Sequence, residues 1–447
     1  MYNEKLAQKL APRHWWPRTR LHQPSSSRWV KPIAIICIIL VTFHWISSIH
    51  VHRIALLDKF SPTVFTHLTQ QDKEVLESTS WRWDETTNSV GGSYSRSDVW
   101  ASRNEWKRLG SGSEGEAFTY NGTVIKVYKA AKFPFRNCVP NTGTDLRWPT
   151  EIAASLLLGG MVDGGHVEGD DGFLPVTDYF LSPATKDEPP RWHFLTPFLP
   201  SGSLAKLAEH LHHSEHAYTA HDLDVLYRPS LERLLDGLDR MHSRHELCHD
   251  DVKPDNIFLS GTKSLGESDE GLDVTKNWML ADLGNAREPS HPYHSSILWS
   301  QLNNNLPDCR VNDVLRLLKS YMLFLRAAVD DVAAFDRQFF DGRESWAMLF
   351  WSTLDAINRG EFVSAISVQA SSKTFDASHG GQQDPLALGR SPPGLCNPLK
   401  RLFLGREQMI ARGVSDALRI SATDGPARRR GLTFLLGVPV ADCQVES

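Results

Sequence analysis

The stretch Leu247-Cys-His249-Asp250-Asp251-Val-Lys253-Pro-Asp255-Asn256-Ile-Phe-Leu259 sets charged and amide side chains between two short apolar runs. A second acidic turn, Met279-Leu-Ala-Asp282-Leu-Gly284, follows it in the chain. Ahead of both, apolar side chains recur at helical spacing, at Leu231, Leu234, Leu235, Leu238 and Met241. This spacing predicts a buried helix that supports the polar loop from behind.

The side chains of this polar loop are of the types that phosphoryl transfer requires. Such a reaction needs a carboxylate near the incoming hydroxyl, a cation near the moving phosphoryl group, and oxygen ligands that hold a metal ion on the phosphates. These types occur in that order along the chain, at Asp251, Lys253, Asn256 and Asp282.

A glycine-rich stretch, Gly110-Ser-Gly112-Ser-Glu-Gly115, lies earlier in the chain. This pattern alone is a weak signal, because dinucleotide-binding folds use it to open a helix. Here β-prone residues follow it and lead to Asn121-Gly122, a strong hairpin signal. The order predicts a strand, a glycine loop, a strand, a tight turn and a strand, which together can cover a nucleotide.

The third of these strands runs from Thr123 to Lys129. Strand alternation places Val124 and Lys126 on one face, where the first can contact a base and the second phosphates. A helix that begins near Thr150 would carry Glu151 in its first turn, where a carboxylate can hold that lysine. The alternatives are a solvated strand lysine and an acid favoured only by the helix dipole.

The segment His-Asp-Asp-Val-Lys-Pro-Asp-Asn (249–256) resembles the His-Arg-Asp-Leu-Lys-Pro-x-Asn catalytic loop of eukaryotic protein kinases. Asp-Leu-Gly (282–284) resembles their Asp-Phe-Gly, and the elements from about Trp106 to Leu325 follow the order of that family. The resemblance implies an α+β, two-lobed protein-kinase-like fold. It would have a small β-rich N-lobe and a larger helical C-lobe. Separately, the apolar stretch described below predicts that a transmembrane helix precedes it.

The resemblance also implies cofactors and site residues. Asp251 would be the catalytic base, Lys253 would steady the γ-phosphate of ATP, and Lys126 would pair with Glu151. Mg²⁺ or Mn²⁺ would be bound by Asn256 and Asp282. The implied nucleotide-binding residues are Gly110, Gly112, Gly115, Val124, Lys126, Thr196, Pro197, Phe198 and Leu199. In this set Thr196 stands at the gatekeeper position, and backbone groups at residues 197–199 would meet adenine.

Two residues and one segment bear on loop anchoring, regulation and the acceptor. Asp313 resembles the aspartate that anchors the catalytic loop of kinases, with an ordinary acid at a helix start as the alternative. Asp250 replaces the arginine that reads a phosphorylated activation loop in many kinases, so we do not expect control by that route. The segment 285–312 is short and has no Ala-Pro-Glu motif, which normally seats the peptide-binding loop.

These features leave three functional hypotheses. The first is an ATP-dependent protein Ser/Thr kinase that transfers the γ-phosphoryl group to a hydroxyl-bearing acceptor, a protein. The second is a nucleotide-binding pseudokinase that serves as a scaffold. The third is a kinase that acts on a glycan or a small molecule. The net charge of −5 offers no basic field to gather nucleic acid, so no nucleic-acid partner is expected.

An uncharged apolar stretch from Pro32 to Ile49 is long enough in helical form to cover most of a bilayer core of about 30 Å. The Lys and Arg residues ahead of it greatly outnumber the single acid, Glu4, which predicts a single-pass membrane protein with a cytoplasmic N-terminus and its domain in the secretory-pathway lumen or outside the cell. An internal hydrophobic helix and a mitochondrial presequence are the alternatives. Asn121-Gly-Thr123 is an N-glycosylation acceptor sequence that can report this topology.

Composition along the chain suggests where domains begin and end. Six cysteines are too scattered for a disulfide framework, although a bridge or two can form in an oxidising lumen. The predicted parts are a cytoplasmic basic tail (1–31), a transmembrane signal anchor (32–52), a polar stalk (53–102), the kinase-like domain (103–360), and a low-complexity segment with a C-terminal tail (361–447).

Overall fold

The structure is a computed structural model. It describes residues 27–65, 67–78, 95–112, 114–129, 148–162, 172–182, 185, 188–260, 265, 278–303, 306, 308–378 and 405–420. The chain divides into two compact units, residues 1–50 and 51–447. Helix α1 (Ser27–Lys59) begins in the first unit, and every later element belongs to the second.

The first unit contains the apolar part of α1. The helix is long and apolar enough between Lys31 and Lys59 to cross a membrane. Its apolar side chains in this unit are exposed, from Ile33 at 56% to Ile46 at 57%.

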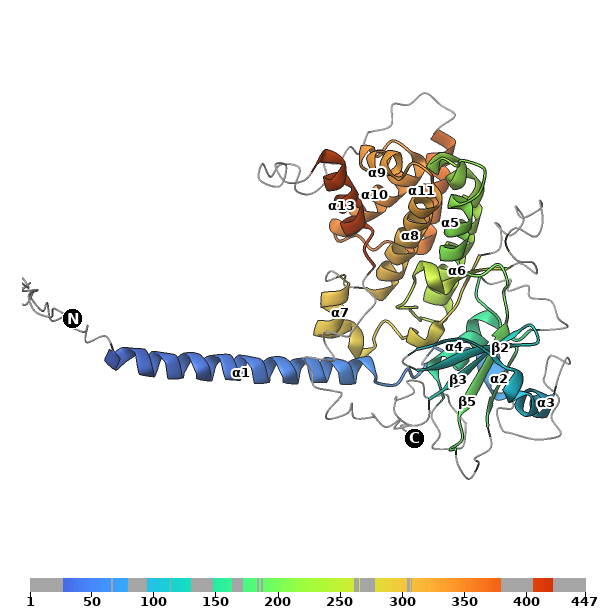
Figure 1. The fold of residues 1–447 in the computed structure, drawn as a ribbon, viewed down its shortest axis with the longest axis horizontal. Helices are drawn as coiled ribbons and strands as arrows, with labels where there is room; N and C mark the ends of the chain where they lie inside the picture. The colour runs from blue at the N-terminus through green and yellow to red at the C-terminus, as the bar shows by residue number, and fades with distance from the viewer. Residues whose placement is uncertain are drawn as a thin grey trace, which may run out of the picture. The chain divides into compact units, whose positions relative to one another are not determined.

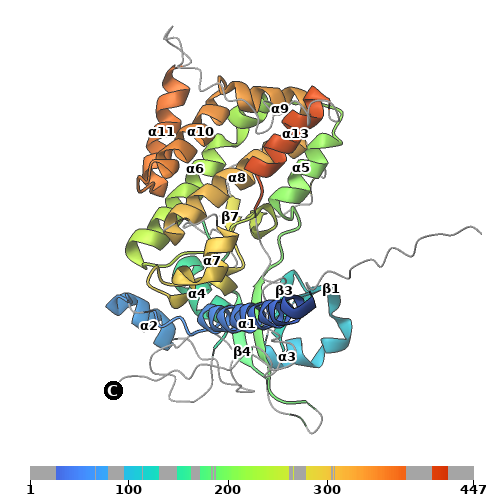
Figure 2. The same cartoon turned by 90° about the vertical axis from the view of Figure 1, so that its left-hand side faces the viewer.

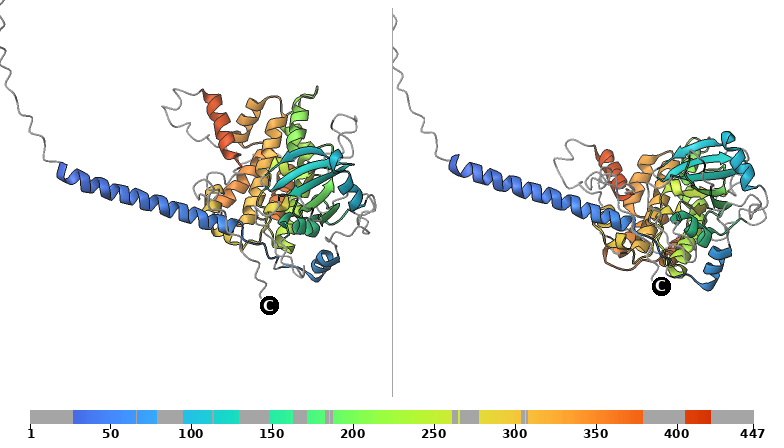
Figure 3. Two further views of the ribbon diagram at one scale, coloured as in Figure 1. Left: turned by 60° about the horizontal axis from the view of Figure 1, so that its bottom comes forward. Right: turned by 90° about the horizontal axis from the view of Figure 1, so that it is seen from below.

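The second unit has a small lobe built on a five-stranded antiparallel sheet, in the order β1-β2-β3-β5-β4. Figure 1 shows these strands on one side of the unit, and Figure 3 shows them from below. The elements of this lobe are α2 (Gln70–Ser78), α3 (Arg96–Ala101), η1 (Arg103–Glu105), β1 (Lys107–Ser111), β2 (Gly115–Tyr120), β3 (Thr123–Tyr128), α4 (Thr150–Gly159), β4 (Asp178–Leu181) and β5 (Trp192–Pro197).

The two faces of this sheet pack differently. One face buries a small apolar cluster of Val99, Ile125, Phe180 and Leu195. The opposite face carries Tyr128, which joins the main core together with α4. Alternation along β3 produces this division, because Ile125 and Tyr128 point to opposite sides of the pleat. The α4 helix also contacts the turn at residues 283–285, so it links the sheet to the rest of the unit.

The larger lobe is helical, as the sequence predicts. Two of its helices, α6 and α8, are buried along most of their length and pack on each other. Its elements are α5 (Leu204–His212), α6 (Ala220–Arg244), η2 (Pro254–Asn256), β6 (Ile257–Leu259), β7 (Trp278–Leu280), η4 (Leu283–Asn285), η5 (Pro292–Ser295), α7 (Ile297–Leu302), α8 (Cys309–Ala328), α9 (Val332–Asp341), α10 (Ser345–Asn358), α11 (Ala365–Ser378) and α13 (Arg406–Ala417).

The sequence predicts a stalk over residues 53–102, but the structure differs over much of this range. Leu56, Phe60, Phe65 and Leu76 are all buried, and α2 packs on α4. Arg96 makes a buried ion pair of 2.7 Å with Asp178 of β4. These side chains are too widely spaced to show a local period, and they become buried only against remote parts of the chain.

The C-terminal boundary at residue 360 also differs from the prediction. Helix α11 packs on α6 and α10, and α13 packs on α9 (Figure 2). Buried Ser372 accepts a hydrogen bond of 2.8 Å from Arg228 of α6. Ser, Ala and Gln make α11 look like low-complexity sequence, whereas tertiary contacts to α6 select it as part of the helical lobe.

Candidate functional site

A cavity of about 1000 Å³ is lined by residues from both lobes of the second unit. The small lobe contributes the glycine-rich turn and Lys126, while the helical lobe contributes Asp251, Lys253, Asn256 and Asp282. This volume is in the range of pockets that bind cofactors. Eight predicted site residues therefore line one cavity, namely Gly110, Gly112, Gly115, Lys126, Asp251, Lys253, Asn256 and Asp282.

The glycine-rich turn closes tightly between β1 and β2. The Gly112 N–H donates to the Gly115 carbonyl at 2.9 Å. A Cβ atom at Gly115 would lie 2.3 Å from the Val127 carbonyl oxygen of β3, so no larger residue fits there without moving the strand. By contrast, a Cβ atom at Gly110 or Gly112 would meet nothing within 4 Å. Packing explains Gly115, while the other two glycines leave open space toward the cavity.

Lys126 is held by carboxylates rather than solvated. Its Nζ forms an ion pair with Glu151 Oε2 of α4, and the Tyr128 hydroxyl donates to the same oxygen. Asp282 Oδ1 lies 3.5 Å from Lys126 Nζ. Burial alone would lower the pKa of Lys126, but Glu151, Asp282 and Glu114 together hold this pKa above its ordinary value. The lysine is therefore a fixed cation in the cavity.

The polar loop (residues 249–256) is arranged around Asp251. Lys253 Nζ donates to Asp251 Oδ2 at 2.7 Å. Asn256 Nδ2 donates to the Asp251 carbonyl at 2.9 Å and to Asp251 Oδ2 at 3.3 Å. The loop thereby fixes a carboxylate, a cation and an amide next to one another.

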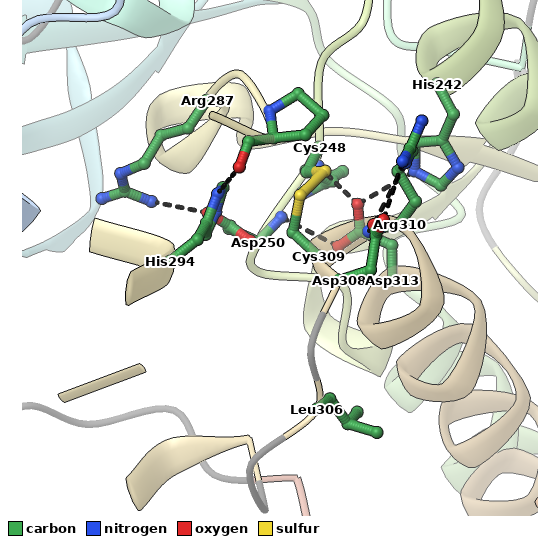
Figure 4. Close-up of a disulfide and its surroundings, with 12 residues drawn as sticks. His242, Cys248, Asp250, Arg287, His294, Leu306, Asp308, Cys309, Arg310 and Asp313 are labelled. Atoms are coloured by element: carbon green, nitrogen blue, oxygen red, sulfur yellow. Dashed lines mark hydrogen bonds and ion pairs between the residues drawn. A yellow bond between two sulfur atoms is a disulfide. The ribbon is translucent and has the colours of Figure 1, made fainter. Parts of the chain in front are cut away.

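Asp313, in the first turns of α8, anchors this loop (Figure 4). Its carboxylate accepts the backbone N–H of His249 at 2.6 Å and that of Asp250 at 2.9 Å. His242 of α6 lies 3.1 Å from the same carboxylate. Asp313 is fully buried. Hydrogen bonds are stronger in the low-dielectric interior of a protein than in water. The interpretation of Asp313 as an anchoring residue agrees with this geometry.

The donor set of the cavity fits a hard divalent cation. Because the Asn256 amide nitrogen is turned toward Asp251, its Oδ1 atom is left as the acceptor. Lys126 and Lys253 keep the pKa of Asp282 below its ordinary value although burial acts in the other direction, so Asp282 is an anion at neutral pH. Amide and carboxylate oxygens are the ligands that Mg²⁺ and Mn²⁺ prefer. Asn256 and Asp282 could hold such an ion.

The predicted adenine-binding residues are placed less favourably. The lining of this cavity does not include Val124, Thr196, Pro197, Phe198 or Leu199. The Phe198 N–H is already used, because it donates to the Gly122 carbonyl at 2.9 Å. Pro197 has no N–H to offer. The contacts of residues 197–199 to adenine therefore stay a prediction.

Several residues of the site escape sequence reasoning. Arg316, one turn after Asp313 on α8, donates to the Asp250 carbonyl at 3.0 Å and lies 3.7 Å from Asp251 Oδ1. Residues three apart on a helix are neighbours, so the spacing of Arg316 from Asp313 could have identified it from the sequence. Glu114 of the glycine turn also reaches the cavity, but no local pattern indicates this.

A disulfide lies directly before the polar loop. Cys248 and Cys309 are bonded, and both are buried. The bond joins the loop to the first residue of α8, beside Asp313 (Figure 4). The sequence allowed for a bridge but could not select this pair.

Comparison with known proteins finds structural likeness without a sequence match. No family model matches the chain, and no curated protein matches it. The chain is similar to the BubR1 kinase domain, with 11% identity over 71% of this chain and 84% of that chain and a TM-score of 0.39. It is also similar to the Mycobacterium tuberculosis PknI kinase domain, with 14% identity over 66% of this chain and 99% of that chain and a TM-score of 0.35.

The fold and the site define the class of protein. A glycine turn over a five-stranded sheet, a strand lysine paired with a helix glutamate, and a polar loop anchored on a buried helix occur together in the second unit. This is the α+β, two-lobed arrangement of a protein-kinase-like domain, as the sequence predicts.

Proposed function

We propose that the chain is an ATP-dependent phosphotransferase, a membrane-anchored protein kinase of the Ser/Thr type. The observation that carries this proposal is that Lys126 of the small lobe and Asp251, Asn256 and Asp282 of the helical lobe line the same cavity. These are the side-chain types that phosphoryl transfer requires, brought together from distant parts of the chain.

Each residue would act through the contacts described above. ATP would supply the phosphoryl group, and a divalent ion held by Asn256 and Asp282 would neutralise charge on its phosphates. Asp251 accepts the proton of the acceptor hydroxyl, with Lys253 beside it as the cation near the transferred group. Lys126, held in place by Glu151, binds the remaining phosphates.

A transfer assay with γ-labelled ATP tests the proposal. The full chain in detergent is incubated with Mg²⁺ or Mn²⁺ and dephosphorylated casein. We expect label transfer by the wild type and a loss of about 10²–10⁴-fold in Asp251→Asn, because the general base is removed. Asp341→Asn, an exposed acid at the end of α9, is the matched control. Equal activity of Asp251→Asn and wild type would contradict the proposal.

A second acceptor class is favoured by one observation. The segment between the Asp-Leu-Gly turn and α8 is short, and its described part folds as η5 and α7. A glycan or small-molecule acceptor needs no peptide-seating loop, so a screen of hydroxyl-bearing glycosides separates it from a protein acceptor. A nucleotide-binding scaffold without catalysis would instead bind MgATP and transfer label to no acceptor.

We propose further that the N-terminus is cytoplasmic and that the domain faces the secretory-pathway lumen or the outside. The buried Cys248–Cys309 disulfide supports an oxidising compartment. Asn121 stands exposed at the β2–β3 hairpin, where a glycan can be attached. Glycosidase treatment should shift the mobility of the wild type and leave Asn121→Gln unchanged. Processing of the N-terminus during mitochondrial import would contradict this topology.

A further inference from the structure

A short segment that begins at the last residue of α1, residues 59–65, runs along residues 286–294, which follow the Asp-Leu-Gly turn. We call these two segments the strap and the post-turn segment. Thr63 Oγ1 of the strap donates to the Ala286 carbonyl at 3.1 Å. Glu288 Oε1 of the post-turn segment accepts the backbone N–H of Val64 at 2.8 Å and that of Phe65 at 2.6 Å. One carboxylate oxygen thus binds two consecutive residues of the strap.

A second group of contacts leads from the strap to the polar loop. Arg287 Nη2 donates to the Lys59 carbonyl at 3.2 Å, while its Nη1 pairs with Asp250 Oδ2 at 3.0 Å. His291 Nε2 lies 3.1 Å from the Ser61 hydroxyl. Because Asp250 immediately precedes Asp251, Arg287 connects the strap to the residue beside the predicted base.

Apolar burial seats the strap and the end of α1. Leu56 is 0% exposed and Phe60 is 8% exposed. They form one cluster with side chains of η5 and α7 and with the disulfide, namely Tyr293, Leu298, Trp299, Cys248 and Cys309. Burying two large apolar side chains contributes a few kcal/mol, which is enough to keep the segment docked.

The strap also reaches the cavity. Lys59 and Phe60 line it together with Asp251 and Asn285. Arg287 also connects the Lys59 carbonyl to Asp250, the residue beside the predicted base. The segment 285–312 has no Ala-Pro-Glu motif, and position 250 has no arginine to read a phosphate. The strap contacts the same segment on which that motif and that arginine would act.

We propose that the strap is a positioning segment of the catalytic site. It holds the post-turn segment against the polar loop without phosphorylation, and it lines the cavity with Lys59 and Phe60. This inference rests on the proposed phosphotransferase function for its catalytic part. Its structural part, the docking of the strap through Glu288, does not depend on that function.

Glu288 allows a test with a conservative rescue. Hydrogen exchange is measured on the full chain in detergent for Glu288→Ala, Glu288→Gln and the wild type. The alanine variant loses both acceptor bonds, so we expect exchange at residues 60–65 and 286–294 to rise about tenfold or more. The glutamine variant keeps an acceptor oxygen and should stay within about twofold of the wild type. Glu361→Ala, which removes an exposed partner of Arg359, is the matched control.

Two exchange results would overturn the docking. One is unchanged exchange of both segments in Glu288→Ala. The other is an equal rise in α4 and α8, which would mean general destabilisation rather than release of the strap.

Kinetics then test the positioning role. Basal ATP turnover, with water as the acceptor, gives kcat and the KM for ATP. We expect Glu288→Ala to lower kcat about tenfold and to leave this KM within about twofold, because Lys126 and Glu151 are not touched. Glu288→Gln should restore kcat. A rise in KM that matches the loss of kcat would overturn the positioning role. If the wild type neither binds nor turns over ATP, the proposed function fails, and the exchange result still decides whether the strap is docked.

Discussion

The guanidinium group of Arg287 lies 3.0 Å from the carboxylate of Asp250, and both side chains are 1% exposed. His294 Nε2 lies 2.9 Å from the same carboxylate oxygen. Burial alone would raise the pKa of Asp250, but His294 and Arg287 keep this pKa well below its ordinary value. Protein kinases often carry a cation at this loop position and a phosphate on the segment that follows. Here the loop position carries an anion, Asp250, and the segment that follows carries a cation, Arg287. The pair therefore forms without a phosphate.

Breaking this pair should destabilise the domain strongly. Arg287→Met removes one of the two cationic partners of a buried carboxylate, so we expect a loss of about 3–5 kcal/mol in the free energy of unfolding. Urea denaturation followed by tryptophan fluorescence measures it. Arg108→Met breaks an exposed pair with Glu116 and should cost less than about 1 kcal/mol. Similar losses in the two variants would contradict the importance of the buried pair.

Loss of the disulfide should lower stability by a different route. The bond between Cys248 and Cys309 closes a sequence separation of 61 residues. Loop-closure entropy predicts a stabilisation of about 4 kcal/mol. Cys309→Ser should therefore lower the midpoint of thermal unfolding, and reductant should do the same to the wild type. Cys37→Ser, which removes an exposed free thiol, should leave the midpoint of thermal unfolding unchanged.

Asp313 should be needed for the conformation of the polar loop. Asp313→Ala leaves the buried N–H groups of His249 and Asp250 without their acceptor, which costs about 2–5 kcal/mol. Asp313→Asn keeps one acceptor oxygen and should lose less. Unfolding curves give the two values, and a larger loss in the asparagine variant would contradict this account of the anchor.

Stability should fall as the pH falls below about 6.5, the pKa of an unperturbed histidine. Burial lowers the pKa of His193 to about 4 and that of His291 to about 3. Each histidine binds a proton more readily in the unfolded chain than in the folded chain. The stability that each contributes above pH 6.5 is therefore lost as the pH falls toward its lowered pKa in the folded chain. His294 acts in the opposite direction. Although burial would lower its pKa, Asp250 raises it, so its contribution is lost as the pH rises.

One variant isolates the His193 contribution. Between pH 6 and 4.5, His193→Gln should reduce the slope of unfolding free energy against pH by about 1.4 kcal/mol per unit. His210→Gln changes an exposed histidine of α5 and should leave this slope as it is. Urea titrations at a series of pH values measure both slopes. An unchanged slope in His193→Gln would mean that this imidazole is not held neutral.

Lys126 should control nucleotide binding. Lys126→Met removes the cation that Glu151 holds in the cavity, and we expect the protection of the domain by MgADP against thermal unfolding to be lost. Lys107→Met, on an exposed position of β1, should keep that protection. Equal protection of both variants would show that Lys126 does not contact phosphates.

Much of the site could be predicted because its chemistry is local. The polar loop places Asp251, Lys253 and Asn256 within a few residues, and alternation along β3 puts Lys126 and Tyr128 on one face. The backbone hydrogen bonds of residues 197–199 were less predictable. A strand pattern locates β5, but it does not show that the Phe198 N–H is already bonded to Gly122.

The order of the elements, the candidate lysine, glutamate and aspartates, and the membrane-length helix followed from the sequence by itself. Short segments carry those signals in their period, turn residues and charge. Only the tertiary structure decided that Leu56 and Phe60 are buried, that Arg287 pairs with Asp250, and that Cys248 bonds Cys309. Each of these contacts joins residues far apart in the chain. Their distance depends on how the intervening elements pack, and no local pattern records it.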